Sequence, residues 1–296
     1  MPRCVNELCL LLGYSRQAYY QGIKSFQEKE FEAEIIIAEV LRIRKTQKHI
    51  GTRKLLHKMH AFLASHGFKI GRDSMFNLLA ERRLLVKQRR RSSTITTFSR
   101  HRYRMFPNII RDFIPMAPNK LWVSDITYIR LKTGFAYLSL ITDAYSRKIV
   151  GYCLCKDLSA EGPLKALRMA LRHNANKEGL IHHSDRGVQY CCDAYVKILH
   201  DNNIGISMTE NGDPLENAIA ERVNGILKRE LLEQEYNTFE QAYRAVAKAC
   251  SIYNNDRPHG SVNYLCPSEA HLVDGKLERK WKNYYPKKQQ KEILIV

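Results

Sequence analysis

Three acidic residues stand at positions where a folded chain needs a compensating cation. Asp125 interrupts residues 121–129, an otherwise apolar and β-branched run with the composition of a central strand. A carboxylate in such a strand costs roughly several kcal/mol unless its charge is balanced, and a divalent cation is the natural partner for oxygen ligands. Asp185 follows a short apolar segment, and Glu221 lies in a stretch with helical spacing. These three side chains are candidate metal ligands.

Three carboxylates gathered around one point would bind two Mg²⁺ ions, or two Mn²⁺ ions, and would support phosphoryl transfer. One ion would activate a water molecule or a 3′-hydroxyl group, and the other would stabilise the leaving oxygen. This arrangement requires the helix with Glu221 to pack across the sheet, so that Glu221 faces the two aspartates. Taken singly, each acid has an ordinary explanation, because strand-end aspartates often cap turns and helical glutamates usually face solvent.

Two basic residues lie close to these acids in the sequence. Lys228 is seven residues beyond Glu221, about two helical turns, and shares its face. It could hold a DNA phosphate beside the metals, with an ordinary surface lysine as the alternative. Arg186, which follows Asp185 directly, is a similar candidate.

Other polar residues near the acids are expected to have supporting roles. His182 and His183 are predicted to be structural or to orient substrate, because imidazoles are poor Mg²⁺ ligands beside carboxylates. Asp143 begins a turn and is expected either to cap it or to hold a metal ligand in position. No role is predicted for residues 257–259, an Arg-Pro-His segment after the last long helix.

Strands and helices alternate after residue 118 and would position the acids. Three strand-like runs separated by short turns predict an antiparallel meander, which is followed by a helix, a strand, a helix and a strand. This order predicts an α/β unit with a mixed five-stranded sheet and helices on both faces, the ribonuclease-H-like fold. The expected strands are 120–131, 135–142, 148–154, 179–183 and 205–208, and the expected helices are 160–173, 193–202, 215–235 and 239–254.

Two all-α segments with helix-turn-helix spacing precede this unit. In the first, a short apolar helix stops at Gly13, and Ser15 caps a second helix over 16–21 that carries Arg16 and Gln17. A charged amphipathic helix over 26–44 is expected to connect the two segments or to bind a partner. In the second, Thr52 caps a helix, and a break at 66–71 precedes a helix over 72–83. Small helical bundles without DNA-binding function show the same pattern. The candidate DNA-contacting residues of the second segment are Arg53, Arg72, Asn77, Arg82 and Arg83.

The charge of the chain is concentrated near its start. The 296 residues carry a formal charge of +18 and are 44% hydrophobic, which allows a buried core beneath a cationic surface. Residues 1–117 hold +14 of this charge. Arg89, Arg90 and Arg91 lie in a basic stretch without apolar periodicity, which predicts a linker that binds a polyanion; a solvated charge run is the alternative.

These patterns divide the chain into five segments. We expect a first helix-turn-helix with its connector helix over 1–45, a second helix-turn-helix over 46–86, a basic linker over 87–117, a catalytic core over 118–275 and a basic tail over 276–296. The longest apolar run, around residues 8–12, is far too short for a membrane span, and no signal peptide is present, so we expect a cytoplasmic protein without membrane contact. The eight cysteines form no CxxC pairs and are expected to be reduced thiols.

Seven segments of the sequence resemble those of a known family. Asp185 and Glu221 are separated by 35 residues, which resembles the DD(35)E signature of transposases and retroviral integrases. The chain resembles the larger-frame transposase of bacterial insertion sequences, whose core is of the retroviral-integrase type. The similar segments, in the order of the family, are LGYSRQAYY (12–20), HIGTRK (49–54), WVSDITY (122–128), DAYSR (143–147), HSDRGVQY (183–190), ENAIAE (216–221) and YNNDRPH (253–259).

The resemblance implies a function for the whole chain. Asp125, Asp185 and Glu221 would be the metal-binding triad, and the reaction would be DNA strand cleavage at the ends of an element followed by strand transfer. The partners would be double-stranded DNA, both terminal repeats and target, and further copies of the chain on paired ends. A smaller upstream-frame protein, joined by frameshifting, is a further expected partner, and association with the nucleoid is implied.

The sequence departs from the family pattern in two places. The family usually has Asp-Asn-Ala where this chain has Glu216, Asn217 and Ala218, which places an additional acid near Glu221. Glu216 and Glu230 therefore remain alternatives to Glu221. The zinc-binding His-His-Cys-Cys module of retroviral integrases is absent, because no cysteine lies between Cys9 and Cys153, and we predict no structural zinc.

Two other functions are compatible with parts of the sequence. A nuclease of the same fold would cut DNA and never join it, and would have little use for two DNA-reading segments. A non-enzymatic DNA-binding regulator would need the helix-turn-helix segments but not the spacing of the triad.

Overall fold

The computed structural model describes residues 5–87, 102–111, 113–174, 177–210 and 217–280. The chain divides into two compact units, Met1–Gln88 and Arg89–Val296. Separate hydrophobic cores stabilise the two units, because each cluster of buried apolar residues draws its members from one unit alone.

The first unit begins with a short helix, α1 (Val5–Leu11), and a long helix, α2 (Arg16–Arg44). Ser15 caps α2 as predicted, since its Oγ accepts a hydrogen bond of 3.1 Å from the Ala18 amide. The separate helices expected over 16–21 and 26–44 are one continuous helix of 29 residues. Gly22 does not interrupt it, because one glycine inside a helix costs only about 1 kcal/mol and no proline is present to break the backbone hydrogen bonds.

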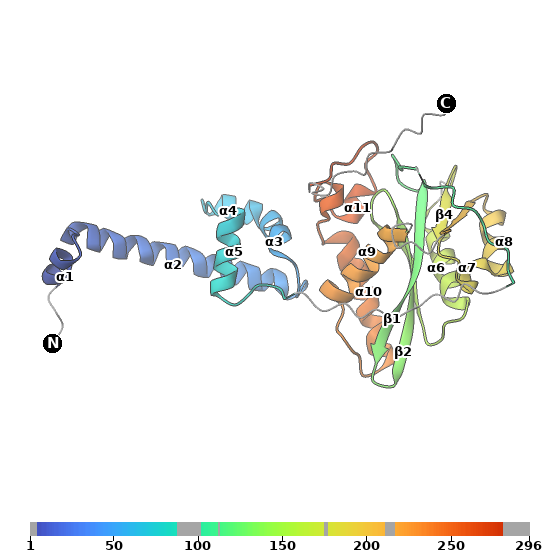
Figure 1. Ribbon diagram of the computed structural model, residues 1–296, viewed down its shortest axis with the longest axis horizontal. Helices are drawn as coiled ribbons and strands as arrows, with labels where there is room; N and C mark the ends of the chain where they lie inside the picture. Colours follow the sequence, from blue (N-terminus) through green and yellow to red (C-terminus); the bar gives the residue numbers. More distant parts are fainter. Residues whose placement is uncertain (1–4, 88–101, 112, 175–176, 211–216, 281–296) are drawn as a thin grey trace, which may run out of the picture. The chain divides into compact units, whose positions relative to one another are not determined.

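Three shorter helices complete the first unit around the C-terminal half of α2 (Figure 1): α3 (Thr52–Lys58), α4 (His60–Ser65) and α5 (Arg72–Glu81). The N-cap of α3 is Gly51 rather than Thr52. The expected boundary at 45/46 does not separate two cores, because α2 and the later helices share one. Its buried members are Ile36, Val40, Ile43, Ile50, Leu55, Met59, Leu63, Met75 and Leu79.

The second unit is built on a mixed five-stranded sheet, which confirms the predicted fold class. β1 (Leu121–Leu131), β2 (Gly134–Asp143) and β3 (Ile149–Cys155) form the antiparallel meander. β4 (Ile181–Ser184) pairs in parallel with β1, and β5 (Gly205–Met208) pairs in parallel with β4. The strand order is therefore β3-β2-β1-β4-β5, with β1 in the centre.

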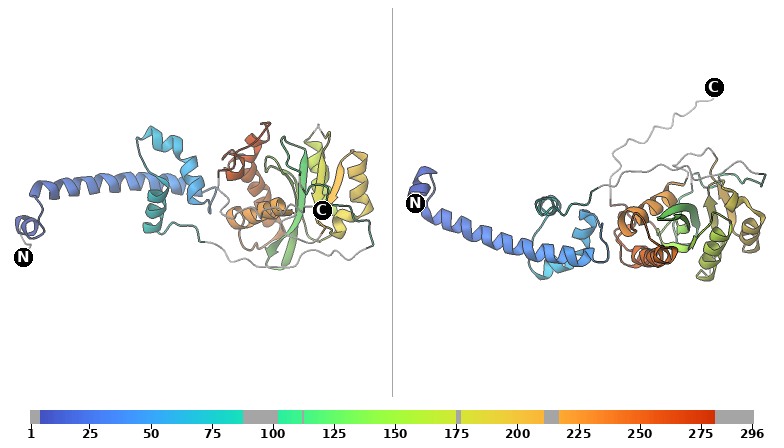
Figure 2. Two further views of the ribbon diagram at one scale, coloured as in Figure 1. Left: turned by 45° about the horizontal axis from the view of Figure 1, so that its top comes forward. Right: turned by 90° about the horizontal axis from the view of Figure 1, so that it is seen from below.

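Helices cover both faces of this sheet (Figures 1 and 2). Trp122 packs in a core with α6 (Glu161–Arg172), α7 (Val188–Cys191) and α8 (Asp193–Asp201). Ile129 and Leu131 pack in a second core, with α9 (Ala218–Ile226) and α10 (Phe239–Asn255). Because side chains alternate along a strand, the odd-numbered residues of β1, Asp125 among them, lie on the α9 and α10 side. A short helix, α11 (Pro267–Ala270), follows α10.

The segment after β5 is less regular than predicted. The helix expected over 215–235 is α9, which begins at Ala218, and a π-helical segment over Leu227–Leu231 continues it. Leu232 then turns to extended backbone with φ −102° and ψ 153° and is buried in the core with α10. Because Leu232 is buried in this way, the helical segment ends at Leu231, four residues before the predicted end at residue 235.

Parts of the expected linker and tail pack on the second unit. The amide of Ile109 donates a 3.1 Å hydrogen bond to Ser207 Oγ on β5, and Phe106 packs against the core beneath α8. At the other end, the Asn263 amide donates to the Glu278 carbonyl at 2.9 Å. Apolar residues within these basic stretches account for the packing, since they bury surface that a purely charged linker would leave in water.

The described residues contain no helix that combines the length and the apolar character needed to cross a lipid bilayer.

Candidate active site

The sheet places the two candidate aspartates side by side. β1 and β4 are parallel neighbours, with Leu121 opposite Ile181 and Val123 opposite His183. Continuing this register by two residues sets Asp125 level with Asp185, one residue past the end of β4. Both aspartates are half-buried. The carboxyl edge of two parallel strands thus brings together two acids that are far apart in the sequence.

Helix α9 and the π-helical segment after it place a polar row along β1. Asn217, Glu221, Asn224 and Lys228 follow one another at intervals of four, three and four residues, so they share one helix face. Asn217 Nδ2 donates to the Ser124 carbonyl at 2.9 Å, Asn224 Nδ2 donates to Asp125 Oδ2 at 2.7 Å, and Lys228 Nζ donates to Thr127 Oγ1 at 3.3 Å. Glu221 lies between the two buried asparagines in this row, and its own side chain is exposed.

The electrostatics of Asp125 reflect this convergence. Burial, and next the negative charge of Asp185, raise the pKa of Asp125 to about 7, and the charge of Glu221 acts in the same direction. Hydrogen bonds from Asn224 Nδ2 and from the Ile126 amide, which is 2.9 Å from Oδ1, oppose the shift. Both other acids of the predicted triad are therefore close enough to Asp125 to influence its ionisation.

The donor set suits a hard divalent cation. The side chains of Asp125, Asp185 and Glu221 present oxygen atoms, and the buried Asn224 Oδ1 beside Asp125 has no hydrogen-bond partner within the described residues. A cation would balance the charge that burial makes costly at Asp125. In the part of the chain that the structure describes, no three His, Cys, Asp or Glu side chains form a ready-made metal site.

The loop after β4 holds Asp185 in position. Asp185 Oδ1 accepts a 3.1 Å hydrogen bond from the Gly187 amide. A Cβ atom at residue 187 would lie only 3.0 Å from this oxygen and 3.1 Å from Gln189 Oε1, so a larger side chain would push the carboxylate away. Glycine at this position allows the close approach of the backbone amide to the acid.

His182 and His183 are buried in hydrogen-bond networks behind the acids. His182 Nε2 lies 2.7 Å from Ser124 Oγ and 2.9 Å from the Tyr195 hydroxyl. Burial, with a smaller contribution from His183, lowers the pKa of His182 to about 3, so its imidazole is neutral at physiological pH. His183 Nδ1 lies 2.9 Å from Ser207 Oγ on β5. Both rings link neighbouring parallel strands, which fits the structural role, one of the two that the sequence suggested.

Asp143 caps the β2–β3 turn, as expected from its sequence position. Its Oδ1 accepts hydrogen bonds of 2.7 Å from both the amide and the hydroxyl of Ser146, and its Oδ2 accepts one of 2.8 Å from the Asn119 amide.

The two alternative glutamates differ from Glu221 in their surroundings. Glu230 forms a bidentate ion pair with the buried Arg257, with Nε to Oε2 at 2.8 Å and Nη2 to Oε1 at 2.9 Å. Its carboxylate is therefore engaged away from the aspartates. Glu216 lies outside the described residues.

Sequence reasoning missed Asn217, Asn224 and the partner of Arg257. The two asparagines carried a usable signal, because they stand on the Glu221 face at helical spacing. Arg257 had none, because its partner Glu230 is 27 residues away in the sequence and meets it only through the packing of α10.

The predicted DNA-contacting residues of the first unit are dispersed over its surface. Arg16 and Gln17 are exposed at the start of α2, and Arg53 and Asn77 are exposed on α3 and α5. Arg72 is exposed and pairs with Asp73 at 2.7 Å.

The end of α5 differs from the prediction. The expected helix over 72–83 ends at Glu81, and Arg82 forms an ion pair with Glu30 of α2. Arg83 adopts a left-handed backbone conformation with φ 55°, which stops the helix. Arg82 and Arg83 therefore follow the last residue of α5, although the sequence predicted that the helix would include them.

The remaining basic candidates belong to the second unit. Arg89, Arg90 and Arg91 lie outside the described residues. Arg186 is half-buried next to Asp185, and Lys228 is exposed at the end of the polar row.

The chain is similar to known proteins along most of its length. Two integrase core domain family models match residues 115–214 and 202–267. The chain is 34% identical over 270 residues to the insertion element IS600 uncharacterized 31 kDa protein of Shigella sonnei, which covers 88% of this chain and 96% of that protein. It is 29% identical over 227 residues to the transposase for insertion sequence element IS629 of Shigella sonnei, over 76% of this chain and 75% of that protein.

Among solved structures, the HTLV-2 integrase catalytic core domain in complex with magnesium is similar with a TM-score of 0.41 and 17% sequence identity, over 53% of this chain and 98% of that chain. The sequence relationships and the family models together assign the protein. The chain belongs to the insertion-sequence transposases that have an integrase-type catalytic core.

Proposed function

We propose that this transposase binds the ends of its insertion sequence and catalyses divalent-metal-dependent DNA strand cleavage and strand transfer, with Asp125, Asp185 and Glu221 as the catalytic triad. The observation that carries the proposal is that three acids from three elements act on one another: Asp125 on the central strand, Asp185 at the end of its parallel neighbour, and Glu221 on the helix that packs on the central strand. A bound divalent cation would offset the cost of a half-buried aspartate in the middle of a central strand.

The residues of the chain have distinct roles in this proposal. Asp125, Asp185 and Glu221 would hold two Mg²⁺ or Mn²⁺ ions, which supply an activated nucleophile and stabilise the leaving oxygen. Asn224 would orient the Asp125 carboxylate through its 2.7 Å hydrogen bond, and the Gly187 amide would orient Asp185. Lys228 and Arg186 would attract the phosphodiester next to the acids.

The first unit would supply DNA affinity and register. Its exposed Arg16, Gln17, Arg53, Arg72 and Asn77 are proposed to contact the terminal repeats, together with Arg89, Arg90 and Arg91. The ion pair with Glu30 leaves Arg82 a weaker candidate for this role, and Arg83 contacts would come from the end of α5. Paired ends would require several copies of the chain, and a smaller upstream-frame protein is a proposed fusion partner.

A strand-transfer assay tests the proposal. Full-length protein would be incubated with a labelled element end, a target plasmid and Mg²⁺, and both nicked and joined products would be measured. We expect cleavage and joining by the wild type, and a loss of at least about 100-fold in Asp125→Asn, Asp185→Asn and Glu221→Gln. Glu235→Gln is the matched control for Glu221→Gln, because it makes the same chemical change in an exposed glutamate whose ion pair with Arg130 contributes little to stability.

The products distinguish the alternatives. Cleavage without joined products would indicate a nuclease, and sequence-specific binding without either product would indicate a regulator. Full cleavage by Asp125→Asn would refute the assigned mechanism.

A further inference from the structure

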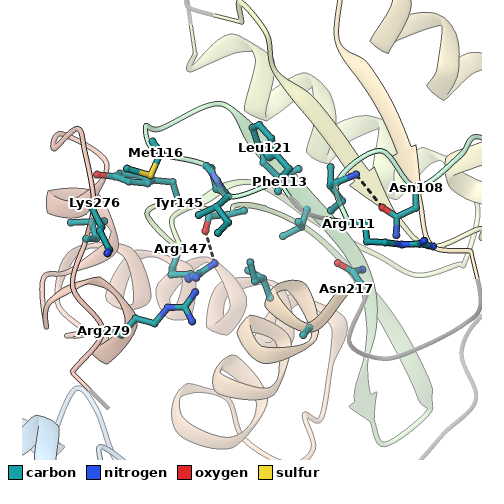
Figure 3. Close-up of a pocket in the computed structure, with 18 residues that line it drawn as sticks. Asn108, Arg111, Phe113, Met116, Leu121, Tyr145, Arg147, Asn217, Lys276 and Arg279 are labelled. Atoms are coloured by element: carbon teal, nitrogen blue, oxygen red, sulfur yellow. Dashed lines mark hydrogen bonds between the residues drawn. The ribbon is translucent and has the colours of Figure 1, made fainter. Parts of the chain in front are cut away.

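The second unit contains a cavity of about 670 Å³, and Figure 3 shows the residues that line it. Parts of residues 108–116 line it, with the start of β1, the β2–β3 turn, the start of α9 and residues 276–279. Arg147, Lys276 and Arg279 lie on one side of the cavity, and Asn108 and Arg111 lie on the other. We call it the arginine pocket, after Arg147 and Arg279.

The lining of the arginine pocket is strongly cationic. Arg111, Arg147, Lys276 and Arg279 contribute to it, and no lining residue that the structure describes is acidic. Arg111 pairs with Glu210 at 2.8 Å. The other three form no ion pair with any described residue. Three cations that face one cavity and form no ion pair with a described acid indicate a site for an anion.

Arg147 is held in place for such a ligand. Its Nη1 donates to the Ala144 carbonyl and its Nε donates to Ser261 Oγ at 3.3 Å, so the guanidinium is fixed while Nη2 keeps its donors. Burial, and then the charge of Arg279, lower the pKa of Arg147. Asp143, the acid behind it, already accepts hydrogen bonds from Asn119 and Ser146. A bound anion would offset the cost of keeping this cation half-buried.

The rest of the wall is apolar and aromatic. Phe113 is 40% exposed and Met116 is 51% exposed, and both line the cavity together with Leu121, Val123 and Tyr145. A small inorganic anion would gain nothing from this surface, whereas a nucleotide combines a phosphate with a flat apolar base. Bases in a duplex are covered by their neighbours, so a concave apolar wall fits a base that has left the stack.

The position of the pocket connects it to the acids. Leu121 and Val123 lie on the same strand and the same face as Asp125, and two strand residues span about 7 Å. Asn217 lines the cavity and donates to the carbonyl of Ser124, next to Asp125. At about 3.4 Å per nucleotide along a stacked strand, the pocket is roughly two nucleotides from the acids.

We propose that the arginine pocket binds an unpaired nucleotide of the DNA substrate next to the phosphodiester that reacts, with its base against Phe113 and Tyr145 and its phosphate on Arg147 and Arg279. This inference rests on the proposed function, because it identifies which part of a DNA substrate occupies a site beside the triad. The pocket would hold the strand end frayed, and so deliver the neighbouring phosphodiester to the acids.

Photo-crosslinking of the full-length protein tests this site without any chemistry at the triad. The probe is an element end with a three-nucleotide single-stranded extension that carries 5-iodo-2′-deoxyuridine. The protein binds this DNA in the presence of EDTA, and the complex is irradiated. Peptide mass spectrometry then identifies the crosslinked residues. We expect crosslinks to Tyr145 or Phe113. The double variant Lys276→Ala/Arg279→Ala removes two exposed cations and should lower the yield at least about fivefold. Arg172→Ala, an exposed arginine of α6 on the opposite face of the sheet, is the control and should leave the yield unchanged.

Three outcomes would overturn the proposal: crosslinks only at other residues, an equal yield from the double variant, or an equal yield from a blunt duplex with the same modified base paired. The catalytic proposal is read separately. The Asp125→Asn protein should retain the crosslink while it loses cleavage. An Asp125→Asn enzyme that still cleaves DNA would contradict the triad but not the pocket. A wild-type protein that cleaves and joins DNA without forming the crosslink would contradict the pocket but not the triad.

Discussion

At the scale of single residues, Asp125 has the most unusual environment in the site. Its residue type and its place in an apolar strand made it a candidate, and the 35-residue spacing between Asp185 and Glu221, with the sequence around each acid, pointed to the three residues together. The supporting groups were harder to predict. Asn224 is recognisable only once α9 is known to contact β1, and Glu230 is set apart from Glu221 only by its ion pair with Arg257.

The raised pKa of Asp125 predicts a pH-dependent effect on stability. An unfolded aspartate ionises near pH 3.8, whereas Asp125 in the fold ionises near pH 7. Ionisation therefore destabilises the fold: the cost is absent below about pH 4, grows as the pH rises toward 7, and is complete above it. In metal-free buffer, Asp125→Asn should raise the free energy of unfolding by roughly 2–4 kcal/mol at pH 8 and leave it nearly unchanged at pH 4.

Urea denaturation at both pH values measures this difference. Asp157→Asn is the control with the opposite sign, because hydrogen bonds with Ser159 lower the pKa of the exposed Asp157, so this variant should gain no stability at pH 8. An Asp125→Asn protein that is less stable than the wild type at pH 8 would contradict the electrostatic account of the site.

At the scale of elements, regular patterns were predictable and their interruptions were not. The three strands of the meander and α10 lie close to their predicted bounds, because alternation and helical spacing are local properties. The early end of α9 and the π-helical segment depend on Leu232 entering the core with α10, a contact between distant segments. The sequence predicted two helices where α2 is one. The charge composition changes along this segment, but the helical backbone conformation continues through it.

The ion pair between Arg257 and Glu230 should fix the end of α10 against the π-helical segment. The Arg257 side chain is only 2% exposed and that of Glu230 is 20% exposed. Arg257→Met would leave Glu230 without its partner and should destabilise the protein by about 3–5 kcal/mol, and Arg257→Met/Glu230→Leu should recover part of the loss. Arg130→Met, which breaks the exposed pair with Glu235, should cost less than about 1 kcal/mol. Equal losses from both single variants, measured by urea denaturation, would show that burial of the pair is unimportant.

At the scale of the whole molecule, separate cores predict two units that unfold independently. Leu79 is fully buried in the core of the first unit, and Leu138 is fully buried in the core that β2 shares with α9 and α10. Each Leu→Ala change should cost about 2–5 kcal/mol in its own unit. Hydrogen exchange should rise in residues 36–79 for Leu79→Ala and in residues 121–155 for Leu138→Ala, and a rise in both regions from either variant would argue against independence.

One predicted segment, the basic linker over 87–117, differs from the structure for a physical reason. The basic stretch after residue 87 was expected to be a linker as far as residue 117, yet Phe106 and Ile110 pack on the catalytic unit. Charge dominates the composition of this stretch and conceals the few apolar side chains that anchor it. The same segment supplies Phe113 and Met116 to the arginine pocket, so its packing shapes the surface beside the triad.

Binding of Mn²⁺ to the full-length protein, followed by electron paramagnetic resonance, tests the central claim most directly. We predict tight binding by the wild type that is lost in Asp125→Asn, Asp185→Asn and Glu221→Gln, each checked for folding by circular dichroism, and retained in Glu235→Gln. Mn²⁺ affinity that is the same in the wild type and all three triad variants would contradict the assignment of these carboxylates as the metal site.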